Sequence, residues 1–300
     1  MDFSDNCNVR RIDNRNEDEW FTEGIKYFEG NGAEQNYAKA LECMENAASL
    51  GSRAAMFNCY LMYSQGIGTQ INTEKAFEWC RKSAEAGDVS AMYSLGICFF
   101  NGIGCKPQPY TAMDWMEKAA ENGNSEAYRI TAQKYEEGIG TKADITKALY
   151  WYEEAARAGY DDAMLKCADI YSTTGNIEAA SAWAEKALVA GNDEALYRYG
   201  RMKMTMAKNA ADIQEILNNY FIPSAHKGHK DALYLCAEAY RVGAGTEKDE
   251  AMALKLYEEA GEKGSRSAID FLVKLYTEGG IAPQDKAKAD YWKRKEELYR

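Results

Sequence analysis

The sequence predicts an all-α protein, a solenoid of about eight helix-turn-helix repeats. Residues 91–123 contain an apolar helical run, a turn with Gly102 and Gly104, and a second run that ends in glycine. The same residue types recur 36 residues earlier, from Ala55, and 36 residues later, from Ala127. Self-similarity at a fixed period of about 30–50 residues is typical of solenoids. The presence of only 4 prolines in 300 residues agrees with a mostly helical chain.

The composition argues against several classes of partner. A net charge of −11 disfavours nucleic acid, whose phosphates require clustered Lys and Arg, and it equally disfavours an anionic membrane surface. No run approaches the roughly 18 apolar residues of a membrane-spanning helix, so we expect none. The polar N-terminal stretch lacks an apolar core of about 7–15 residues, so we expect no secretory leader.

The repeats divide the chain into an arm and one long domain. Residues 1–18 are polar and charged, and we expect a flexible arm there. Residues 19–300 then form a single solenoid domain. We number the slots of each repeat from the small residue that opens its first helix, helix A; this slot is Glu in the first repeat and Ala in the others. Slot 1 falls at Glu19, Ala55, Ala91, Ala127, Ala163, Ala195, Ala232 and Ala268.

Fixed slots predict the two helices of each repeat. Helix A carries apolar residues at slots 1, 5 and 9, the spacing of one helical face, and slot 9 is aromatic in seven of eight repeats. Slots 12 and 14 are glycine in five repeats, as at Gly66 and Gly68, where a left-handed conformation ends the helix. Helix B has alanine at slot 22 and most often Trp at slot 25, so that helices approach closely beside a large side chain. A glycine at slot 33 ends helix B.

Three repeats depart from this pattern. The fifth repeat loses its glycine loop at residues 172–176. The sixth, residues 195–228, lacks the glycine pair and has Lys203 at the aromatic slot, so we expect the main geometric irregularity there. The last repeat ends in a charged helix over residues 286–300, as expected for a cap that faces solvent.

The segments LGICFFNGIG…AMDWMEKAAENG and YEEGIGTKADITKALYWYEEAARAG resemble the Sel1-like repeat, the longer relative of the tetratricopeptide repeat. The resemblance covers roughly residues 19–300, with the motif in phase eight times. It implies a right-handed superhelical α-solenoid whose inner wall is lined by the A helices. It also implies a non-catalytic scaffold or adaptor for protein–protein interaction, as such arrays generally are.

No catalytic or metal-binding pattern emerges from the sequence. The chain lacks the common zinc-protease, phosphate-loop and serine-hydrolase motifs, and its G-x-G pairs follow no strand. The two histidines, His226 and His229, have only Cys236 as a nearby third ligand, whereas a structural zinc site uses about four. We therefore expect no enzyme activity, no metal, no cofactor and no small-molecule substrate.

The cysteines fit a packing role. Cys59, Cys167 and Cys236 occupy slot 5, and Cys43 and Cys80 occupy slots 25 and 26. A secreted, cysteine-rich branch of the Sel1-like family ties its two helices by a disulfide in every unit. Here no cysteine pair recurs at a fixed spacing, which favours reduced thiols and a cytoplasmic protein. Two other cysteines, Cys7 and Cys105, fall in the arm and in a loop and are candidates for exposure.

Slots 3, 7 and 10 form the free stripe of helix A if slots 1, 5 and 9 face the core. This stripe is apolar in the first three repeats and mostly polar later. Because exposed apolar patches and aromatic residues mark interaction sites, we expect a partner peptide or helix to bind there. The predicted binding residues, here called the N-terminal stripe, are Phe21, Ile25, Phe28, Phe57, Leu61, Tyr93, Ile97 and Phe100.

Two alternatives remain open at this stage. Slots 3 and 7 are also suited to packing between neighbouring A helices, and the arm is able to fold over the stripe. The acidic composition favours a basic partner, and it permits a different function: a stoichiometric inhibitor or immunity-type protein that covers a basic toxin or enzyme. That alternative predicts an interface whose association rate falls steeply with salt.

Overall fold

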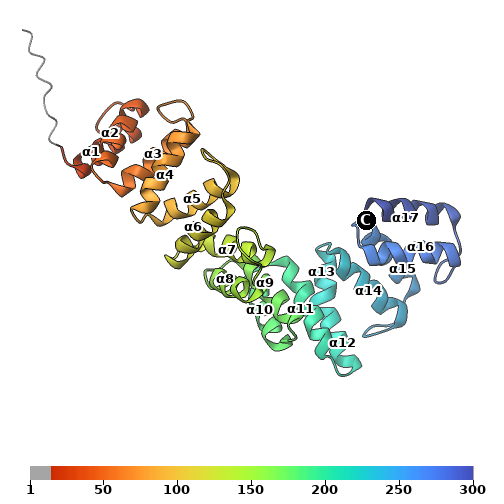
Figure 1. Cartoon of the computed structure of the whole chain (residues 1–300). Coiled ribbons are helices and arrows are strands. Elements are labelled where there is room, and N and C mark those ends of the chain that lie inside the picture. Colours follow the sequence, from red (N-terminus) through yellow and green to blue (C-terminus); the bar gives the residue numbers. More distant parts are fainter. Residues whose placement is uncertain (1–14, 300) are drawn as a thin grey trace, which may run out of the picture. The chain divides into compact units, whose positions relative to one another are not determined.

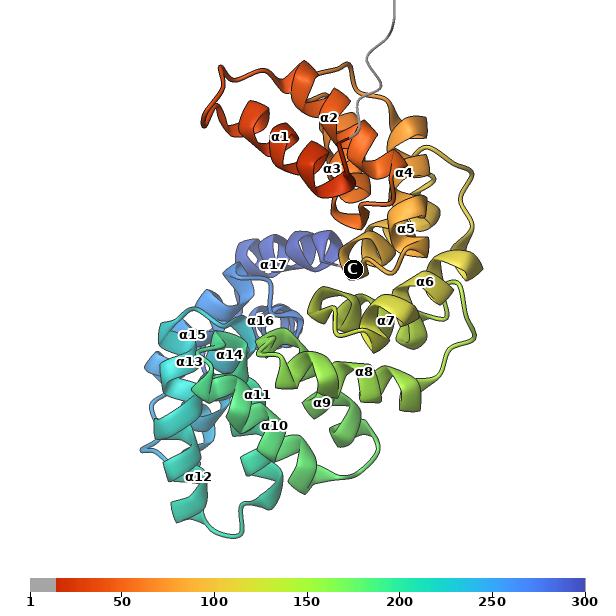
Figure 2. The same cartoon turned by 90° about the vertical axis from the view of Figure 1, so that its left-hand side faces the viewer.

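The computed structural model describes residues 15–299, and every regular element in that range is a helix. The chain divides into two compact units, Met1–Trp151 and Tyr152–Arg300. Figure 1 shows each unit as a row of antiparallel helix pairs, and Figure 2 gives the same pairs from the side. The predicted all-α solenoid of about eight helix-turn-helix repeats is confirmed.

The first four repeats comprise α1 to α8. Their bounds are α1 Glu17–Glu29, α2 Tyr37–Ser49, α3 Arg53–Gln65, α4 Thr73–Glu85, α5 Val89–Asn101, α6 Pro109–Glu121, α7 Ser125–Glu137 and α8 Ile145–Arg157, which spans the boundary between the units. Most of the predicted arm, residues 1–18, lies outside the described residues, and its last two residues belong to α1.

The remaining repeats contain α9 Asp161–Thr173, α10 Ile177–Val189, α11 Asp193–Met206, α12 Ala210–Ile216, the π-helix η1 Leu217–Phe221, α13 Ile222–His226, α14 Lys230–Val242, α15 Glu250–Glu262, α16 Arg266–Glu278 and α17 Lys286–Leu298. Each A helix begins two residues before its slot 1 residue, so the 36-residue frame read from the sequence places all eight A helices.

The core faces follow the predicted slots. The slot 1 alanines from Ala55 onward and the slot 22 alanines are all buried, so helices A and B approach closely. Slot 5 is likewise buried from the second repeat onward, whereas Glu19 and Glu23 of the first repeat keep exposed surface. The first A helix therefore presents a more polar face, as a terminal repeat requires.

Glycine is required at the two loop positions, slots 12 and 14, for different reasons. The first, for example Gly66 with φ 72°, is the left-handed residue that ends helix A. The second also has positive φ, but its decisive property is a close approach to the preceding repeat. A Cβ added at Gly104 would lie 2.1 Å from the carbonyl oxygen of Thr73, and one at Gly68 would lie 2.2 Å from that of Tyr37. Repeats in this part of the chain thus stack through a glycine without space for a side chain.

The sixth repeat is the predicted irregularity. Without the glycine pair, α11 runs to Met206, and helix B is assembled from α12, η1 and α13. Pro223 lacks the N–H that an α-helix would direct at the carbonyl of residue 219, which favours the wider π turn at this point. The irregular helix B packs Leu217 and Phe221 into the core beside α14.

Candidate functional site

The N-terminal stripe lies on three A helices of the first unit. Phe21, Ile25 and Phe28 are on α1, Phe57 and Leu61 are on α3, and the other three residues are on α5. All eight side chains are half-buried, so none is completely enclosed by the neighbouring helices and none is fully exposed. In α7 the same slots carry Arg129 and Gln133, which are exposed.

Part of the stripe also contributes to the core. Phe21, Ile25 and Phe28 pack against the core cluster of the first two repeats, and Phe57 and Phe100 pack against the next cluster. The Phe28 ring makes an edge contact with Tyr37, with ring centroids 5.3 Å apart. The Lys134 ammonium lies 5.6 Å from the centroid of Phe100. Five of the eight residues therefore pack against two core clusters.

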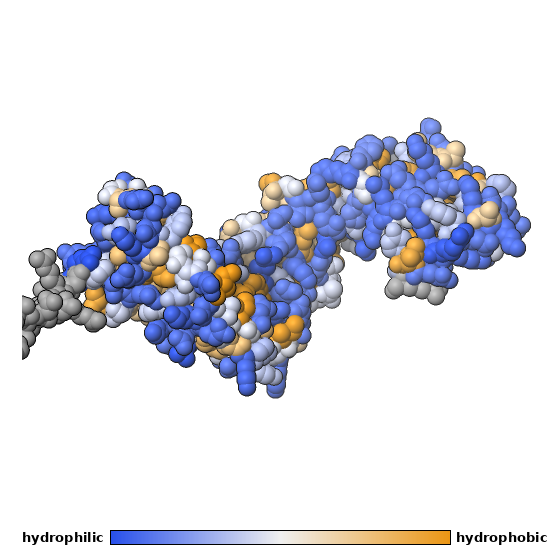
Figure 3. All heavy atoms as spheres, turned by 90° about the horizontal axis from the view of Figure 1, so that it is seen from above, coloured by the Kyte–Doolittle hydropathy of each residue, from blue (hydrophilic) through white to orange (hydrophobic). Residues whose placement is uncertain are grey.

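The most exposed large apolar side chains of the first unit are different residues, which the sequence analysis missed. They lie in the loops and on the B helices; Tyr110 on α6, for instance, has 75% of its surface exposed. Figure 3 shows hydrophobic atoms gathered in patches on one face of this unit. The set comprises Tyr37, Leu50, Ile71, Ile103, Tyr110, Ile139, Ile145 and Tyr150. Two members of this set, Ile103 and Ile139, lie between the two glycines of their loops, and this position could have marked them in the sequence.

A second missed feature is a polar clasp around the slot 9 tyrosine. The Tyr63 hydroxyl donates to Glu45 on the preceding helix B at 2.6 Å and accepts from Lys75 on its own helix B at 3.2 Å. The arrangement recurs at Tyr135 with Glu117 and Lys147, and at Tyr276 with Glu258 and Lys288. Burial and the acidic partner raise the pKa of Tyr63. The clasp therefore links two successive repeats and favours the protonated form of the tyrosine hydroxyl.

The recurrence of Glu at slot 27 and Lys at slot 21 could have revealed the clasp from the sequence. The third repeat supports this interpretation, because Phe99 replaces the tyrosine there and Arg81 and Thr111 replace the two partners. The tyrosine, the Glu and the Lys are thus all replaced in this repeat. This is expected if the tyrosine hydroxyl is the group that binds the two charged side chains.

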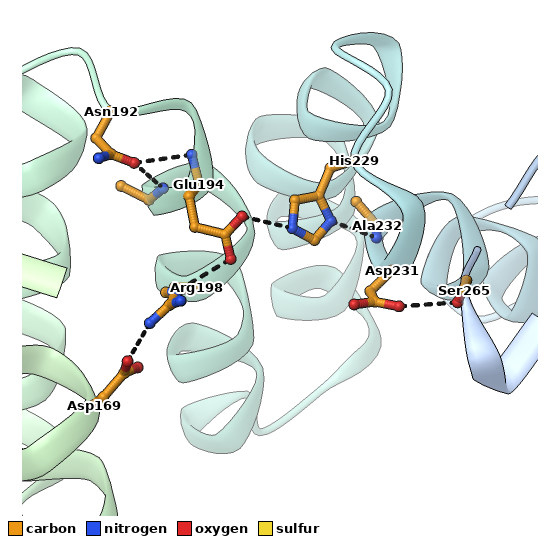
Figure 4. A network of polar contacts seen from close by, with 9 residues as sticks. Asp169, Asn192, Glu194, Arg198, His229, Asp231, Ala232 and Ser265 are labelled. Carbon is orange, nitrogen blue, oxygen red and sulfur yellow. Dashed lines mark hydrogen bonds and ion pairs between the residues drawn. The ribbon is translucent and has the colours of Figure 1, made fainter. Parts of the chain in front are cut away.

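In the second unit the A helices border a polar cavity of about 400 Å³. An ion-pair network lies along this cavity, as Figure 4 shows: Arg198 binds Asp169 and also Glu194, the latter at 3.1 Å. Glu194 accepts in turn from Nε2 of His229 at 2.9 Å. The network joins α9, α11 and the start of α14, so it links three successive repeats.

His229 has a structural role in this network. Its Nδ1 accepts the backbone N–H of Ala232 at 3.2 Å and so caps the N-terminus of α14. Its ring stacks on Tyr197 with centroids 4.2 Å apart. The other candidate ligands do not converge on it: His226 is exposed, and Cys236 is buried with 2% of its surface accessible. No group of three His, Cys, Asp or Glu residues within the range 15–299 is placed to hold a metal ion.

Beside the polar cavity lies an apolar one of about 410 Å³, created by the irregular sixth repeat. Its floor comes from η1 and the adjacent helices and includes Met204, Leu217, Phe221 and Leu235. Arg201 and Thr205 line both cavities. The irregularity of this repeat was predictable from the sequence, but the cavity was not, because its lining includes Leu217 and Phe221 of the five-residue π turn.

Five cysteines occupy the core positions that were predicted for them. Cys43, Cys59, Cys80, Cys167 and Cys236 are all buried. Burial raises the pKa of the Cys59 thiol, like that of Cys236, to about 12, so both thiols stay protonated at neutral pH. Cys105 is half-buried, and Cys7 lies outside the described residues.

These features define a helical-repeat protein with hollowed and partly apolar A-helix faces. The Sel1 repeat family matches residues 24–52, 53–88, 89–124, 125–160 and 230–265, more than half of the sequence, and the chain belongs to this family. The fifth, sixth and eighth repeats, which lack the glycine pair, fall outside the matches. Sel1 repeat proteins are generally protein-interaction scaffolds and are typically non-catalytic.

Solved structures agree on the fold. A Sel1 repeat protein from Oxalobacter formigenes is 23% identical, with 94% of this chain and 83% of that chain covered and a TM-score of 0.64. The C-terminal part of a TPR repeat-containing protein from Cytophaga hutchinsonii is 14% identical, with coverages of 84% and 99% and a TM-score of 0.51. An immunity protein from Pseudomonas aeruginosa is 21% identical, with 71% of this chain and 82% of that chain covered. Its TM-score is 0.44, which is too low to support an inference about function. No curated protein sequence matches significantly.

Among the described residues, no helix has both the length and the apolar character needed to cross a membrane.

Proposed function

We propose that this protein is a non-catalytic scaffold or adaptor that binds a peptide or helix of a partner protein along the N-terminal stripe. The exposure pattern of its A helices carries the proposal. From the second repeat onward slots 1 and 5 are buried, whereas the apolar residues at slots 3, 7 and 10 of α1, α3 and α5 keep part of their surface accessible. Aromatic side chains of this kind are the usual anchors of protein interfaces.

The dimensions suit a short segment. At a helix spacing of about 9 Å, three A helices extend over roughly 20–30 Å. This length accommodates an extended peptide of ~8 residues or a helix of about four turns. The partly exposed rings of Phe28 and Phe100 lie on α1 and α5, the first and last A helices of the set.

Charge and cysteine placement refine the proposal. The net charge of −11 favours a basic partner, because opposite charges around an apolar groove speed association. The buried cysteines serve as small core residues, which suits reduced thiols and therefore the cytoplasm.

Affinity capture from the native lysate tests the site. Wild type is compared with a Phe28→Glu/Phe100→Glu double variant, after circular dichroism has established that both are folded. A Tyr110→Glu/Tyr150→Glu variant is the matched control, since it places the same charges on exposed B-helix aromatics of the same unit. We expect the partner to be retained by wild type and by the control and to be lost by the stripe variant.

Retention of the partner by the folded stripe variant would contradict the proposal, as would an unfolded variant, which would place both phenylalanines in the core. Salt dependence separates the two functions: binding to an apolar stripe changes little with ionic strength, whereas an inhibitor that docks through the acidic surface loses association rate steeply as salt rises.

A further inference from the structure

Arg201 stands where the two cavities of the second unit meet. It is exposed on α11 at slot 7, and together with Thr205 it lines both the polar and the apolar cavity. Its contact within the protein is with Tyr197, whose ring centroid lies 5.9 Å from the guanidinium carbon. No carboxylate among residues 15–299 forms an ion pair with Arg201.

Most other charged groups of the two cavities have internal partners. Arg198 is bound by Asp169 and Glu194, and Glu238 accepts from Arg241 at 2.6 Å and from the Tyr257 hydroxyl. Asp231 accepts the Ser265 hydroxyl at 2.9 Å. Arg201 is therefore the cation of this region that is available to an incoming carboxylate.

The apolar cavity provides a second point of recognition, for an apolar side chain of the partner. Its lining side chains include Met204, Ile213 and Leu217, and its volume of about 410 Å³ exceeds that of any one side chain. Burying a Leu, Phe or Met side chain there is favourable, because such a group leaves water for an apolar surface. Both cavities are open to solvent, which suits an anchor residue that remains attached to a longer chain.

We propose that these adjoining cavities bind a peptide segment of a partner protein in which a large apolar residue stands beside Asp or Glu. The apolar side chain enters the cavity over Leu217 and Phe221, and the carboxylate pairs with Arg201 at its rim. The site lies in the second unit and is independent of the N-terminal stripe, so either proposal is able to fail alone.

The test uses the full-length protein and a random 12-residue peptide library displayed on phage. Enriched sequences are synthesised with a fluorescein label, and their affinity is measured by fluorescence anisotropy. We expect an apolar–acidic pair in the enriched peptides and about a tenfold weaker affinity for Arg201→Glu, since a charge-assisted pair becomes a repulsion. Lys274→Glu is the matched control, because Lys274 is exposed at slot 7 of the last repeat.

A second variant tests the apolar cavity without disturbing the core. Val242 lines the cavity with 55% of its surface exposed, and Val242→Glu is expected to weaken the same peptides, whereas Val189→Glu on α10 leaves them unchanged. Peptides without a carboxylate that bind Arg201→Glu as well as wild type would overturn the proposal. So would basic peptides that bind this variant more tightly, or binding of decanoate without any peptide, which would assign the cavity to a lipid.

Discussion

In the first unit, successive repeats contact each other at the second loop glycine, slot 14. At Gly104 and Gly140 an added Cβ would lie 2.1 Å and 2.2 Å from a carbonyl oxygen of the preceding repeat's helix B region. At Gly32, in the first repeat, no described atom lies within 4 Å of that position. Backbone conformation was the reason that the sequence indicated for these glycines, and steric exclusion is a second reason that only the structure shows.

Gly104→Ala should therefore destabilise the protein more than Gly123→Ala. Both glycines have positive φ, 69° and 87°, so both substitutions strain the backbone by about 1 kcal/mol. Only the Gly104 variant also forces a methyl group against the Thr73 carbonyl, whereas the Cβ at residue 123 meets open space. Thermal unfolding followed by circular dichroism measures the difference, and equal losses in the two variants would show that stacking does not depend on the close approach.

Tyr276→Phe is expected to cost about 1 kcal/mol by removing the clasp hydroxyl. That hydroxyl donates to Glu258 at 2.6 Å and accepts from Lys288 at 3.0 Å. Burial and the Glu258 hydrogen bond raise the pKa of Tyr276, so the clasp contributes below the ordinary tyrosine pKa of 10.0 and is lost as pH rises through the higher folded value.

The control for the clasp is Tyr240→Phe. Residues 222 and 252, which correspond to the Glu and Lys of the clasp, are Ile222 and Met252 around this tyrosine. Chemical denaturation should show Tyr240→Phe within about 0.5 kcal/mol of wild type. A loss as large as that of Tyr276→Phe would mean that ring packing, rather than the clasp, determines the effect.

At the scale of the element, much of the fold was predictable because the repeats carry the same residue types at the same slots. The slot 1 position, alanine in seven of the eight repeats, indicated where every A helix begins, and the missing glycine pair with Lys203 identified the irregular repeat. The π turn at Leu217–Phe221 was not predictable, since its wider turn depends on packing against α14 as well as on Pro223.

The candidate site was only partly predictable for a related reason. Helical spacing assigned Phe57 and Phe100 to the free face, but how much of each ring is accessible depends on loops and side chains of neighbouring repeats. The cavity at Arg201 depends on the distances between α11, α14 and the irregular helix B, which no local sequence pattern encodes.

The start of α14 provides a prediction for an individual helix. His229→Ala should destabilise the protein by about 1 kcal/mol, because the first turn of α14 loses its side-chain cap. His229→Asn should recover most of this loss, since asparagine is among the best N-caps and performs that role at Asn124 before α7. If both variants lose equal stability in thermal unfolding, the stacking on Tyr197 and the contact with Glu194 matter more than the cap.

For the whole molecule, partner binding is proposed for the A-helix faces, whereas the loops and the polar clasps stack successive repeats. Family membership establishes the repeat architecture. The proposed interaction surface is the half-buried apolar stripe of the first unit. The exposed B-helix aromatics, Tyr110 and Tyr150, are the competing surface in the same unit.

Site-specific photo-crosslinking in cells tests whether the partner binds along the N-terminal stripe. A photoreactive phenylalanine analogue replaces Leu61, in the middle of the stripe, or Tyr110 on α6 as the control, and adducts are identified by mass spectrometry. We expect a partner adduct from position 61 and none from position 110. An adduct formed only from position 110 would place the binding surface on the B helices and contradict the account.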